Sequence, residues 1–232
     1  MGEEVEDLMK LTEQGIAVIE GDAYLSADII REGRLDVARE ALLQFRSLIP
    51  EGGTVADIGA CLGDYTKTFA EFVGRKGRVY AFEPNPPVFE CLSHNLQFMH
   101  AGVVIAFGVG LGEAEAEVEI IVDHHNIGAS RLTYPSSRST GAITVSTLDH
   151  VARDWDRLDF IKIDAEGYEP LILNGGVETI QRFRPVMLME INTWMLGKLE
   201  FSPEAVYQRL DALGYEFPRF DGPHGDILCL PK

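Results

Sequence analysis

The 232-residue sequence is poor in cysteine. Its three cysteines, Cys61, Cys91 and Cys229, are an odd number, lie far apart and include no Cys-x-x-Cys pair. A framework of disulfides is therefore excluded, and nothing in the spacing indicates a zinc site. We expect three buried or half-buried thiols with no role in chemistry.

Positive charge is also scarce. The chain has 20 Lys and Arg residues against 37 Asp and Glu residues, which gives a formal net charge of -17. Nucleic acids and anionic membranes are bound by basic surfaces, so the charge argues against both as partners. A neutral or cationic small molecule fits better, although an acidic surface can serve solubility alone.

Long apolar runs are absent as well. No segment approaches the length of a membrane span, and the N-terminus, Met1-Gly2-Glu3-Glu4, is acidic where a secretory signal would be basic and then apolar. We therefore expect a cytoplasmic protein. A hydrophobic content of 46% over this length is sufficient for one folded domain with an ample core.

From residue 54 onward, strand patterns alternate with helix patterns. This alternation predicts an α/β fold with a mostly parallel sheet and helices on both faces. The turn residues at 221–225 predict a hairpin that makes the last strand antiparallel. Strands are expected at 54–59, 78–83, 103–108, 159–164, 185–191, 215–220 and 226–230, with shorter ones at 114–122 and 143–146, and helices at 65–73, 86–98, 148–153, 169–182 and 203–213.

Residues 1–50 precede this alternation and are expected to be helical, because their apolar residues recur at near-helical spacing. Pro50-Glu51-Gly52-Gly53 ends this section. We therefore divide the chain into a helical N-terminal extension, residues 1–50, and a core domain, residues 51–232.

The most informative motif is a glycine turn between an apolar strand and a helix, at Thr54–Thr66. Such a turn brings bare backbone and helical N–H groups close to a ligand. It departs from the dinucleotide fingerprint, because aligning Gly59 with the second glycine of G-x-G-x-x-G puts Asp57 at the first and Leu62 at the third. A carboxylate there would repel a pyrophosphate but suits a ligand with an ammonium group, such as S-adenosylmethionine. Glu83 follows the next strand, where acids of doubly wound folds bind ribose hydroxyls.

Several blocks together resemble the FkbM family of S-adenosylmethionine-dependent methyltransferases, over roughly residues 50–195. The resemblance implies a class I, Rossmann-like methyltransferase fold: a mostly parallel seven-stranded sheet with an antiparallel last strand and helices on both faces. The blocks are Asp57-Ile58-Gly59-Ala60 with Gly63 and Tyr65, Phe82-Glu83-Pro84, Thr147-Leu148-Asp149, Ile161–Glu169, Leu173-Asn174-Gly175-Gly176, Arg184-Pro185-Val186 and Glu190-Ile191.

With the resemblance, the motifs predict a binding site for the methyl donor. The simpler interpretation is that the glycines form an ordinary strand-to-helix turn and that Asn85 caps helix 86–98. The predicted donor-binding residues are Asp57, Gly59, Ala60, Gly63, Tyr65 and Thr66 for the methionine end, Glu83, Pro84 and Asn85 for the ribose, and Gly108 and Val109 for the adenine.

Acidic residues at the ends of two later strands are the candidate catalytic residues: Asp164, Glu166 and Glu190. Ligands of open α/β sheets bind at the carboxyl ends of strands, and methyl transfer requires alignment of the acceptor and removal of one proton. Mg²⁺ held by Asp164, Glu190 and Asn192 is an alternative that we favour less than a metal-free base. Glu166 could instead cap helix 169–182.

The polar segment after residue 123 is expected to lie over the site. One of His124 and His125 could act as a base there, although exposed loop histidines are common. The candidate acceptor-binding residues are His125, Asn126, Ser130 and Arg131. We also predict that residues 1–50 and 123–141 together form a lid that selects the acceptor; the alternatives are that the extension covers a sheet edge or pairs two subunits of a homodimer.

The sequence thus predicts O-methylation of a small-molecule hydroxyl, on a sugar or secondary metabolite, with S-adenosylmethionine as donor. A non-catalytic nucleotide-binding module of the same fold is the alternative outside the enzymes. A nicotinamide-dependent oxidoreductase is a second alternative, against which Asp57 argues.

Overall fold

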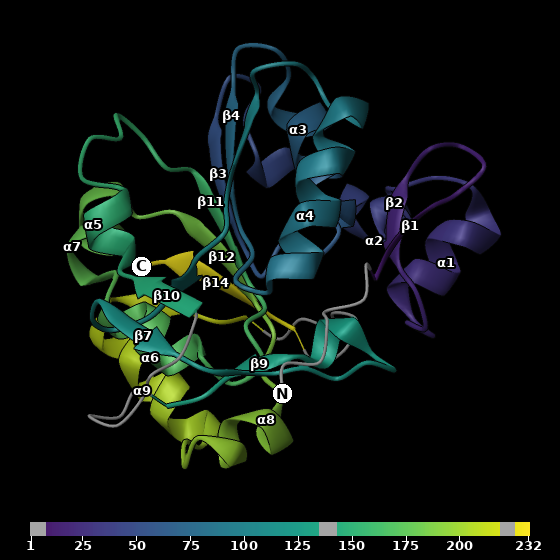
Figure 1. The fold of residues 1–232 in the computed structure, drawn as a ribbon. Helices are drawn as coiled ribbons and strands as arrows, with labels where there is room; N and C mark the ends of the chain where they lie inside the picture. The colour runs from purple at the N-terminus through teal and green to yellow at the C-terminus, as the bar shows by residue number, and fades with distance from the viewer. Residues whose placement is uncertain (1–7, 135–142, 219–225) are drawn as a thin grey trace.

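A seven-stranded sheet forms the centre of the molecule (Figure 1). The computed structural model describes residues 8–134, 143–218 and 226–232. The strand order is β13-β14-β12-β11-β3-β4-β5, and β14 runs antiparallel to both of its neighbours. The predicted sheet, mostly parallel with an antiparallel last strand, is therefore confirmed. The strands are β3 (Thr54–Ile58), β4 (Arg78–Phe82), β5 (Val104–Phe107), β11 (Phe160–Ile163), β12 (Val186–Met189), β13 (Tyr215–Glu216) and β14 (Ile227–Pro231).

Helices cover both faces of this sheet, with α3 and α4 on one side and α6, α7 and α9 on the other (Figure 1). All four residues of β11 are buried, as expected for a central strand between two helical layers. The helices of the core domain are α3 (Asp64–Val73), α4 (Pro86–Asn95) with the 3₁₀ turn η2 (Leu96–Phe98), α5 (Leu148–Val151), α6 (Glu169–Asn174), α7 (Val177–Phe183), α8 (Thr193–Lys198) and α9 (Pro203–Ala212).

The single helix expected at 169–182 is wrong, because α6 ends at Asn174 and α7 begins at Val177. Between them, a Cβ atom at Gly175 would lie 1.9 Å from the backbone oxygen of Gly112. The turn therefore packs backbone against backbone, and glycine is required there. The other expected helices end within a few residues of their predicted bounds, and α8 was not predicted.

The N-terminal extension differs from its prediction. Residues 9–19 form an antiparallel hairpin of β1 (Met9–Leu11) and β2 (Ala17–Ile19), so the expectation of helix is wrong there. Gly15, with a φ of +78°, allows the turn, and all three residues of β2 are buried. Helical structure does follow, in α1 (Leu25–Glu32), α2 (Arg39–Leu42) and the 3₁₀ helix η1 (Leu43–Leu48).

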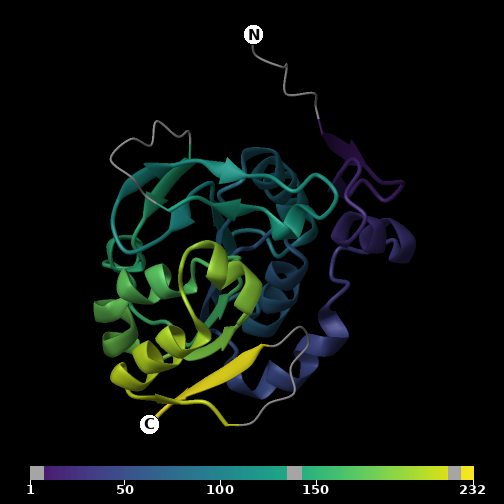
Figure 2. The same cartoon turned by 90° about the horizontal axis from the view of Figure 1, so that it is seen from below.

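An insertion between β5 and α5 forms two further small sheets, of order β6-β10-β7 and β8-β9. The strands expected at 114–122 and 143–146 are present, the first divided into two. Figure 2 shows the turn η3 of this insertion reaching toward the N-terminal segment. The elements are β6 (Gly110–Leu111), β7 (Ala116–Val118), β8 (Ile120–Ile121), η3 (Ile127–Ala129), β9 (Arg131–Leu132) and β10 (Ile143–Ser146).

Part of the predicted loop, residues 135–141, and the predicted turn at 221–225 lie outside the described residues. Within the part of the chain that the structure describes, no helix has the length and apolar character needed to cross a bilayer.

Candidate functional site

The turns that follow β3 and β11 meet at the carboxyl edge of the sheet. Gly59 follows β3 with a φ of +81°, and a Cβ atom on it would lie 1.8 Å from the backbone oxygen of Asp164. Any other residue at this position would force the two turns apart. The glycine turn and the acidic block, which are over 100 residues apart in sequence, are therefore neighbours in space.

Above this contact lies a cavity of about 280 Å³, here called the polar cavity. Five carboxylates line it, whereas Lys162 is the only basic residue among the described residues that line it. So acidic a cavity favours a cationic ligand over an anionic one. Its lining residues are Leu25, Gly59, Cys61, Asp64, Tyr65, Glu83, Asn126, Ile127, Gly128, Lys162, Asp164, Glu166 and Glu190.

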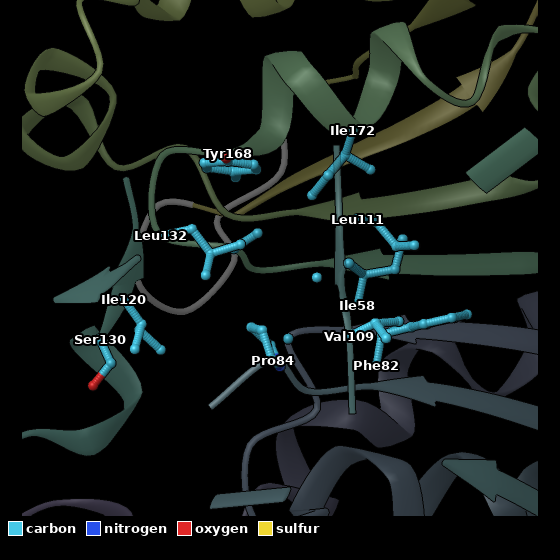
Figure 3. A pocket seen from close by; sticks show the side chains of 13 residues that line it. Ile58, Phe82, Pro84, Val109, Leu111, Ile120, Ser130, Leu132, Tyr168 and Ile172 are labelled. Atoms are coloured by element: carbon cyan, nitrogen blue, oxygen red, sulfur yellow. The ribbon is translucent and has the colours of Figure 1, made fainter. Parts of the chain in front are cut away.

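A second cavity of about 50 Å³, here called the apolar cavity, shares Gly59 with the first. Figure 3 shows aliphatic and aromatic side chains around it, from the central sheet on one side and from β8 and β9 on the other. Pro84 and Val109, two of the predicted donor-binding residues, line it. Its lining residues are Ile58, Gly59, Phe82, Pro84, Val109, Gly110, Leu111, Ile120, Ser130, Leu132, Ala165, Tyr168 and Ile172.

Glu83 follows β4 and is only 7% exposed, yet it faces the polar cavity. Its two carboxylate oxygens accept hydrogen bonds from the backbone N–H groups of Asn85 (2.8 Å) and Cys61 (3.0 Å). Burial raises the pKa of Glu83 to about 7, and these two bonds oppose the rise. Each oxygen keeps a lone pair, so the carboxylate can still accept bonds from two hydroxyls.

Asn85 stands at the N-cap position of α4, but its side chain makes no capping hydrogen bond. It is 2% exposed, and among the described residues neither of its side-chain polar atoms has a hydrogen-bond partner. A buried amide without a partner is costly. The capping explanation for Asn85 is therefore wrong, and Asn85 lines neither the polar nor the apolar cavity.

Asp57 lies beneath the polar cavity instead of lining it. Its carboxylate is fully buried, accepts a hydrogen bond of 2.5 Å from the Thr66 hydroxyl, and lies 4.0 Å from the ammonium of Lys162. Burial raises the pKa of Asp57, while Lys162 and Thr66 counteract the rise. The acid that reaches the cavity from the glycine turn is Asp64, whose pKa burial raises to about 7.

Lys162 lines the polar cavity, although the sequence predictions did not single it out. In the register of β11 and β3 it lies opposite Asp57, and its Nζ donates to the backbone oxygen of Gly59 (2.9 Å). The same Nζ lies 3.2 Å from a carboxylate oxygen of Asp164 and 4.9 Å from the ring centroid of Tyr65. Burial acts to lower the pKa of Lys162, but the surrounding acids outweigh it and raise that pKa. The available signal was a lysine within a strand of otherwise apolar residues, because a buried lysine needs a partner.

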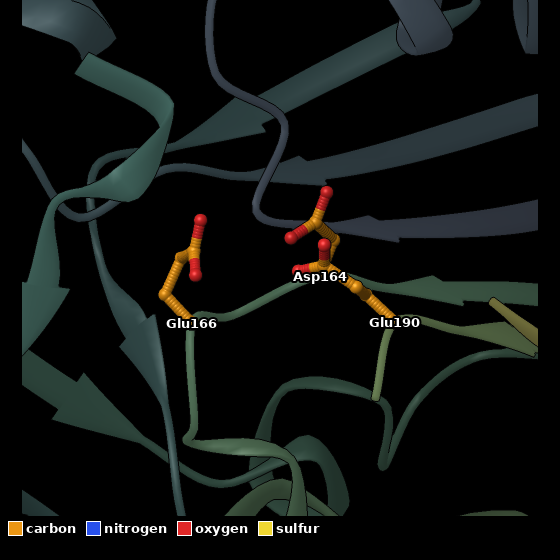
Figure 4. A group of neighbouring side chains, drawn as sticks. All are labelled: Asp164, Glu166 and Glu190. Atoms are coloured by element: carbon orange, nitrogen blue, oxygen red, sulfur yellow. The ribbon is translucent and has the colours of Figure 1, made fainter. Parts of the chain in front are cut away.

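Asp164, Glu166 and Glu190 bring carboxylate oxygens within 4.8 Å of one another (Figure 4). Burial, together with the charge of Asp164 and a hydrogen bond to it, raises the pKa of Glu190 to about 9. Burial and Asp164 also raise the pKa of Glu166 to about 8. Both glutamates therefore hold their protons more tightly than exposed carboxyls do, and Asp164 lies beside the ammonium of Lys162. The predicted catalytic acids are assembled in one place.

The alternative role of Glu166, as the cap of the helix that follows β11, is not seen in the structure. Glu166 does not cap α6; Glu169 instead accepts hydrogen bonds from the N–H groups of Ala165 (3.1 Å) and Gly167 (3.2 Å). Glu166 has a φ of +50°, an unfavourable value for a residue other than glycine. Such strain is typical of functional positions.

Asn192, one of the three residues proposed from the sequence to bind a metal, also has a structural role. The side-chain oxygen of Asn192 caps α8, accepting from the N–H groups of Trp194 and Met195 at 3.2 Å each. Among the described His, Cys, Asp and Glu residues, Asp164, Glu166 and Glu190 form a cluster close enough to share a cation. A hard divalent ion prefers such oxygens, but acidic clusters also bind protons or substrates.

The remaining predicted donor residues have structural contacts. Ala60 is buried and donates its N–H to the backbone oxygen of Phe82, and Gly63 precedes α3 with a φ of +95°. A Cβ atom on Gly108 would lie 2.9 Å from the ring of Phe89. Ala60, Gly63 and Gly108 therefore shape the turns without lining either cavity.

The four candidate acceptor residues are divided between several places. Asn126 lines the polar cavity, and Ser130 lines the apolar cavity. Arg131 is close enough to Glu166 for its charge to oppose the rise in that residue's pKa. The ring of His125 lines neither cavity and makes an edge contact with the ring of Tyr24, with the centroids 5.9 Å apart.

A sequence model of the FkbM methyltransferase domain matches residues 57–217, about two thirds of the chain. The chain belongs to the FkbM methyltransferase family. The match includes the glycine turn, Glu83 and the acidic cluster, so the resemblance noted from the motifs is confirmed. No curated protein sequence matches the chain.

Solved structures show the same class I methyltransferase fold at low sequence identity. Methyltransferase FkbM from Methylobacillus flagellatus KT has a TM-score of 0.53 and 17% identity, over 87% of this chain and 52% of that one. An O-methyltransferase from Bacillus cereus, in complex with SAH, has a TM-score of 0.53 and 14% identity, over 84% and 80%. The chain thus spans about half the length of the Methylobacillus protein.

Proposed function

We propose that this FkbM protein transfers a methyl group from S-adenosylmethionine to a hydroxyl of a small molecule, a sugar or a secondary metabolite. The observation that carries the proposal is the adjacency of two unlike cavities that share Gly59, one apolar and one acidic. S-adenosylmethionine has the same division, because it joins a flat nucleoside to a chain bearing a sulfonium and an ammonium.

The residues present fit this donor. Pro84 and Val109 offer apolar surface to the adenine, and Glu83 offers free lone pairs to the ribose hydroxyls. Asp64 and Asp164 face the space where the positive charges of the donor would lie.

When bound, the donor supplies a methyl group that is already electrophilic. The protein then has to orient the acceptor hydroxyl and take its proton. Glu166 is the candidate base, because burial and Asp164 raise its pKa to about 8 and make its ionised carboxylate a better proton acceptor than an exposed one. Asp164 lies beside this glutamate and forms an ion pair with Lys162 at 3.2 Å.

The acceptor is proposed to be neutral or cationic. A phosphate or carboxylate on the acceptor would meet the charge of Asp164 and would compete with it for Lys162. A net charge of -17 argues in the same way against a nucleic-acid acceptor. A nicotinamide dinucleotide is disfavoured too, because its pyrophosphate would face several carboxylates.

Calorimetry with S-adenosylmethionine, S-adenosylhomocysteine and NAD tests donor binding. We expect the first two to bind and NAD to fail. Glu83→Gln should weaken binding by about 1.5–3 kcal/mol, which is about 10- to 150-fold in Kd. Glu90→Gln, an exposed acid on α4, is the matched control. Tighter binding of NAD than of S-adenosylmethionine would show the donor assignment to be wrong.

Transfer of a labelled methyl group into a panel of hydroxylated metabolites then separates an enzyme from a non-catalytic binding module of the same fold. The enzyme predicts label in an acceptor, whereas donor binding without transfer to any acceptor of the panel would favour the module.

A further inference from the structure

Two segments distant in sequence are fastened together by the carboxylate of Asp22. Its Oδ1 accepts hydrogen bonds from the N–H groups of Ile127 (3.2 Å) and Tyr24 (3.3 Å), and its Oδ2 accepts from the N–H of Ser26 (2.7 Å). The side chain is 6% exposed. Asp22 therefore braces the start of α1 and at the same time binds the backbone of the insertion 105 residues away.

A second backbone bond and apolar packing strengthen this junction. The N–H of Ala23 donates to the backbone oxygen of His125 at 2.9 Å. Ile127 is 3% exposed and belongs to the same buried cluster as Val18 and Ile19 of β2 and Ile29 of α1. The N-terminal segment thus covers one side of the loop at 125–127.

The loop is also braced from within. The Oδ1 of Asp123 accepts from the N–H groups of His125 and Asn126 at 3.0 Å each, and the Ser130 hydroxyl accepts from the N–H of Asp123 at 3.1 Å. Because these bonds fix the conformation of the loop, its contacts with Asp22 and Ala23 determine its position relative to the rest of the molecule.

The junction forms one side of the polar cavity. Leu25 lines this cavity together with Asn126, Ile127 and Gly128, and we call these four residues the wall. The wall carries no charge, whereas most of the remaining lining is acidic. An acceptor that presents a hydroxyl to the acids would therefore rest its carbon skeleton on the wall.

We propose that Leu25 is a specificity-determining residue that bounds the acceptor, and that Asp22 is a positioning residue that holds the wall in place. This inference rests on the proposed function, because it assigns the wall to the acceptor and not to the donor. The competing interpretation is that the N-terminal segment only covers α4 and leaves the site unaffected.

Hydrogen exchange tests the positioning role without any catalytic assay. In the Asp22→Ala variant we expect the amide of Ile127 to exchange at least tenfold faster than in the wild type. Asp22→Asn, which keeps one acceptor oxygen, should give an intermediate rate and covers the case in which the alanine variant fails to fold. Asp28→Asn, which changes a half-exposed acid on α1, should leave the amide of Ile127 unchanged. Wild-type protection of that amide in folded Asp22→Ala protein would overturn the role of Asp22.

Two measurements on Leu25→Trp test the specificity role. We expect transfer of labelled methyl groups from S-adenosylmethionine into a mixture of methyl glycosides and phenols to fall at least tenfold, while the Kd for S-adenosylhomocysteine stays within twofold. Ile30→Trp, on the exposed side of α1, should change neither quantity.

Other outcomes of these measurements would count against Leu25 in separate ways. An equal loss of donor affinity would place the wall at the donor, and unchanged transfer would remove Leu25 from the site. If the wild-type protein neither binds S-adenosylhomocysteine nor transfers methyl groups, the proposed function fails and the acceptor assignment with it. The hydrogen-exchange result would still decide the role of Asp22.

Discussion

Replacing Glu190 by glutamine should make the ligand-free protein less sensitive to alkaline pH. Burial and the neighbouring Asp164 raise the pKa of Glu190 from 4.5 to about 9, so the folded protein holds a proton that the unfolded chain releases. The stability that this proton contributes is fully present below pH 4.5 and is lost as the pH rises toward 9. A glutamine at this position resembles the protonated form at every pH.

The size of the effect follows from the shift. Each pH unit between the two pKa values costs about 1.4 kcal/mol, so the limit between pH 6 and pH 9 is about 4 kcal/mol for one fully buried group. Glu190 is only partly buried, so solvent screens part of this shift and we expect about 1–3 kcal/mol. For a chain of this length, that corresponds to a difference of about 2–12 °C in Tm.

Thermal unfolding of the ligand-free protein at pH 6 and pH 9, followed by circular dichroism, measures this difference. Both proteins will lose stability, because Glu166, Glu83 and Asp64 also have raised pKa values, between about 7 and 8. The loss should be smaller in Glu190→Gln by the stated amount, and Glu90→Gln should behave as the wild type does. An equal loss of Tm in wild type and Glu190→Gln would refute the assignment of the proton.

Three further predictions concern Lys162, Gly59 and the metal alternative. Lys162→Met should lower the free energy of unfolding by about 3–5 kcal/mol in urea titrations, because it leaves the buried Asp57 without a counter-charge, and Lys162→Arg should lose less. Gly59→Ala should cost about 4 kcal/mol or more, or prevent soluble expression, because its Cβ would overlap the backbone oxygen of Asp164. Methyl transfer should survive exhaustive dialysis against EDTA, since a metal-free base is the favoured scheme; loss of activity that Mg²⁺ restores would establish a metal site instead.

Much of the fold could be predicted because its signals are local. Alternating apolar runs and turn residues indicated the strands of the central sheet and its antiparallel last strand, and the family resemblance implied the same arrangement. Prediction failed where a distant contact decides the local structure. The break between α6 and α7 exists because Gly175 packs against the backbone of Gly112, and nothing near Gly175 in sequence reveals that neighbour. The β1–β2 hairpin also depends on a distant contact. Its apolar residues are spaced as in a helix, but their burial against α4 stabilises the hairpin instead.

The sequence indicated which acidic residues stand at the strand ends of the candidate site, but not how their side chains and their neighbours are arranged. Asp164, Glu166 and Glu190 were expected to converge, because parallel strands end at one edge, and they do. The use of Asn192 as a helix cap was not foreseen, since α8 has no strong apolar pattern of its own. The pairing of Asp57 with Lys162 depends on the register of β3 and β11, which sequence spacing does not contain.

That pairing changes what Asp57 can do. Asp57 is fully buried and faces the ammonium of Lys162. It is therefore a poor partner for the ammonium of a ligand, because the ligand would have to displace Lys162 from its place beside Asp57. The same lysine binds the backbone oxygen of Gly59 and a carboxylate oxygen of Asp164, so displacing it would also release both turns. The acidic position at the start of the glycine turn is therefore best understood as one half of a structural pair that keeps Lys162 charged. In the proposed function, the acids that contact the cationic part of the donor are therefore Asp64 and Asp164, which line the polar cavity.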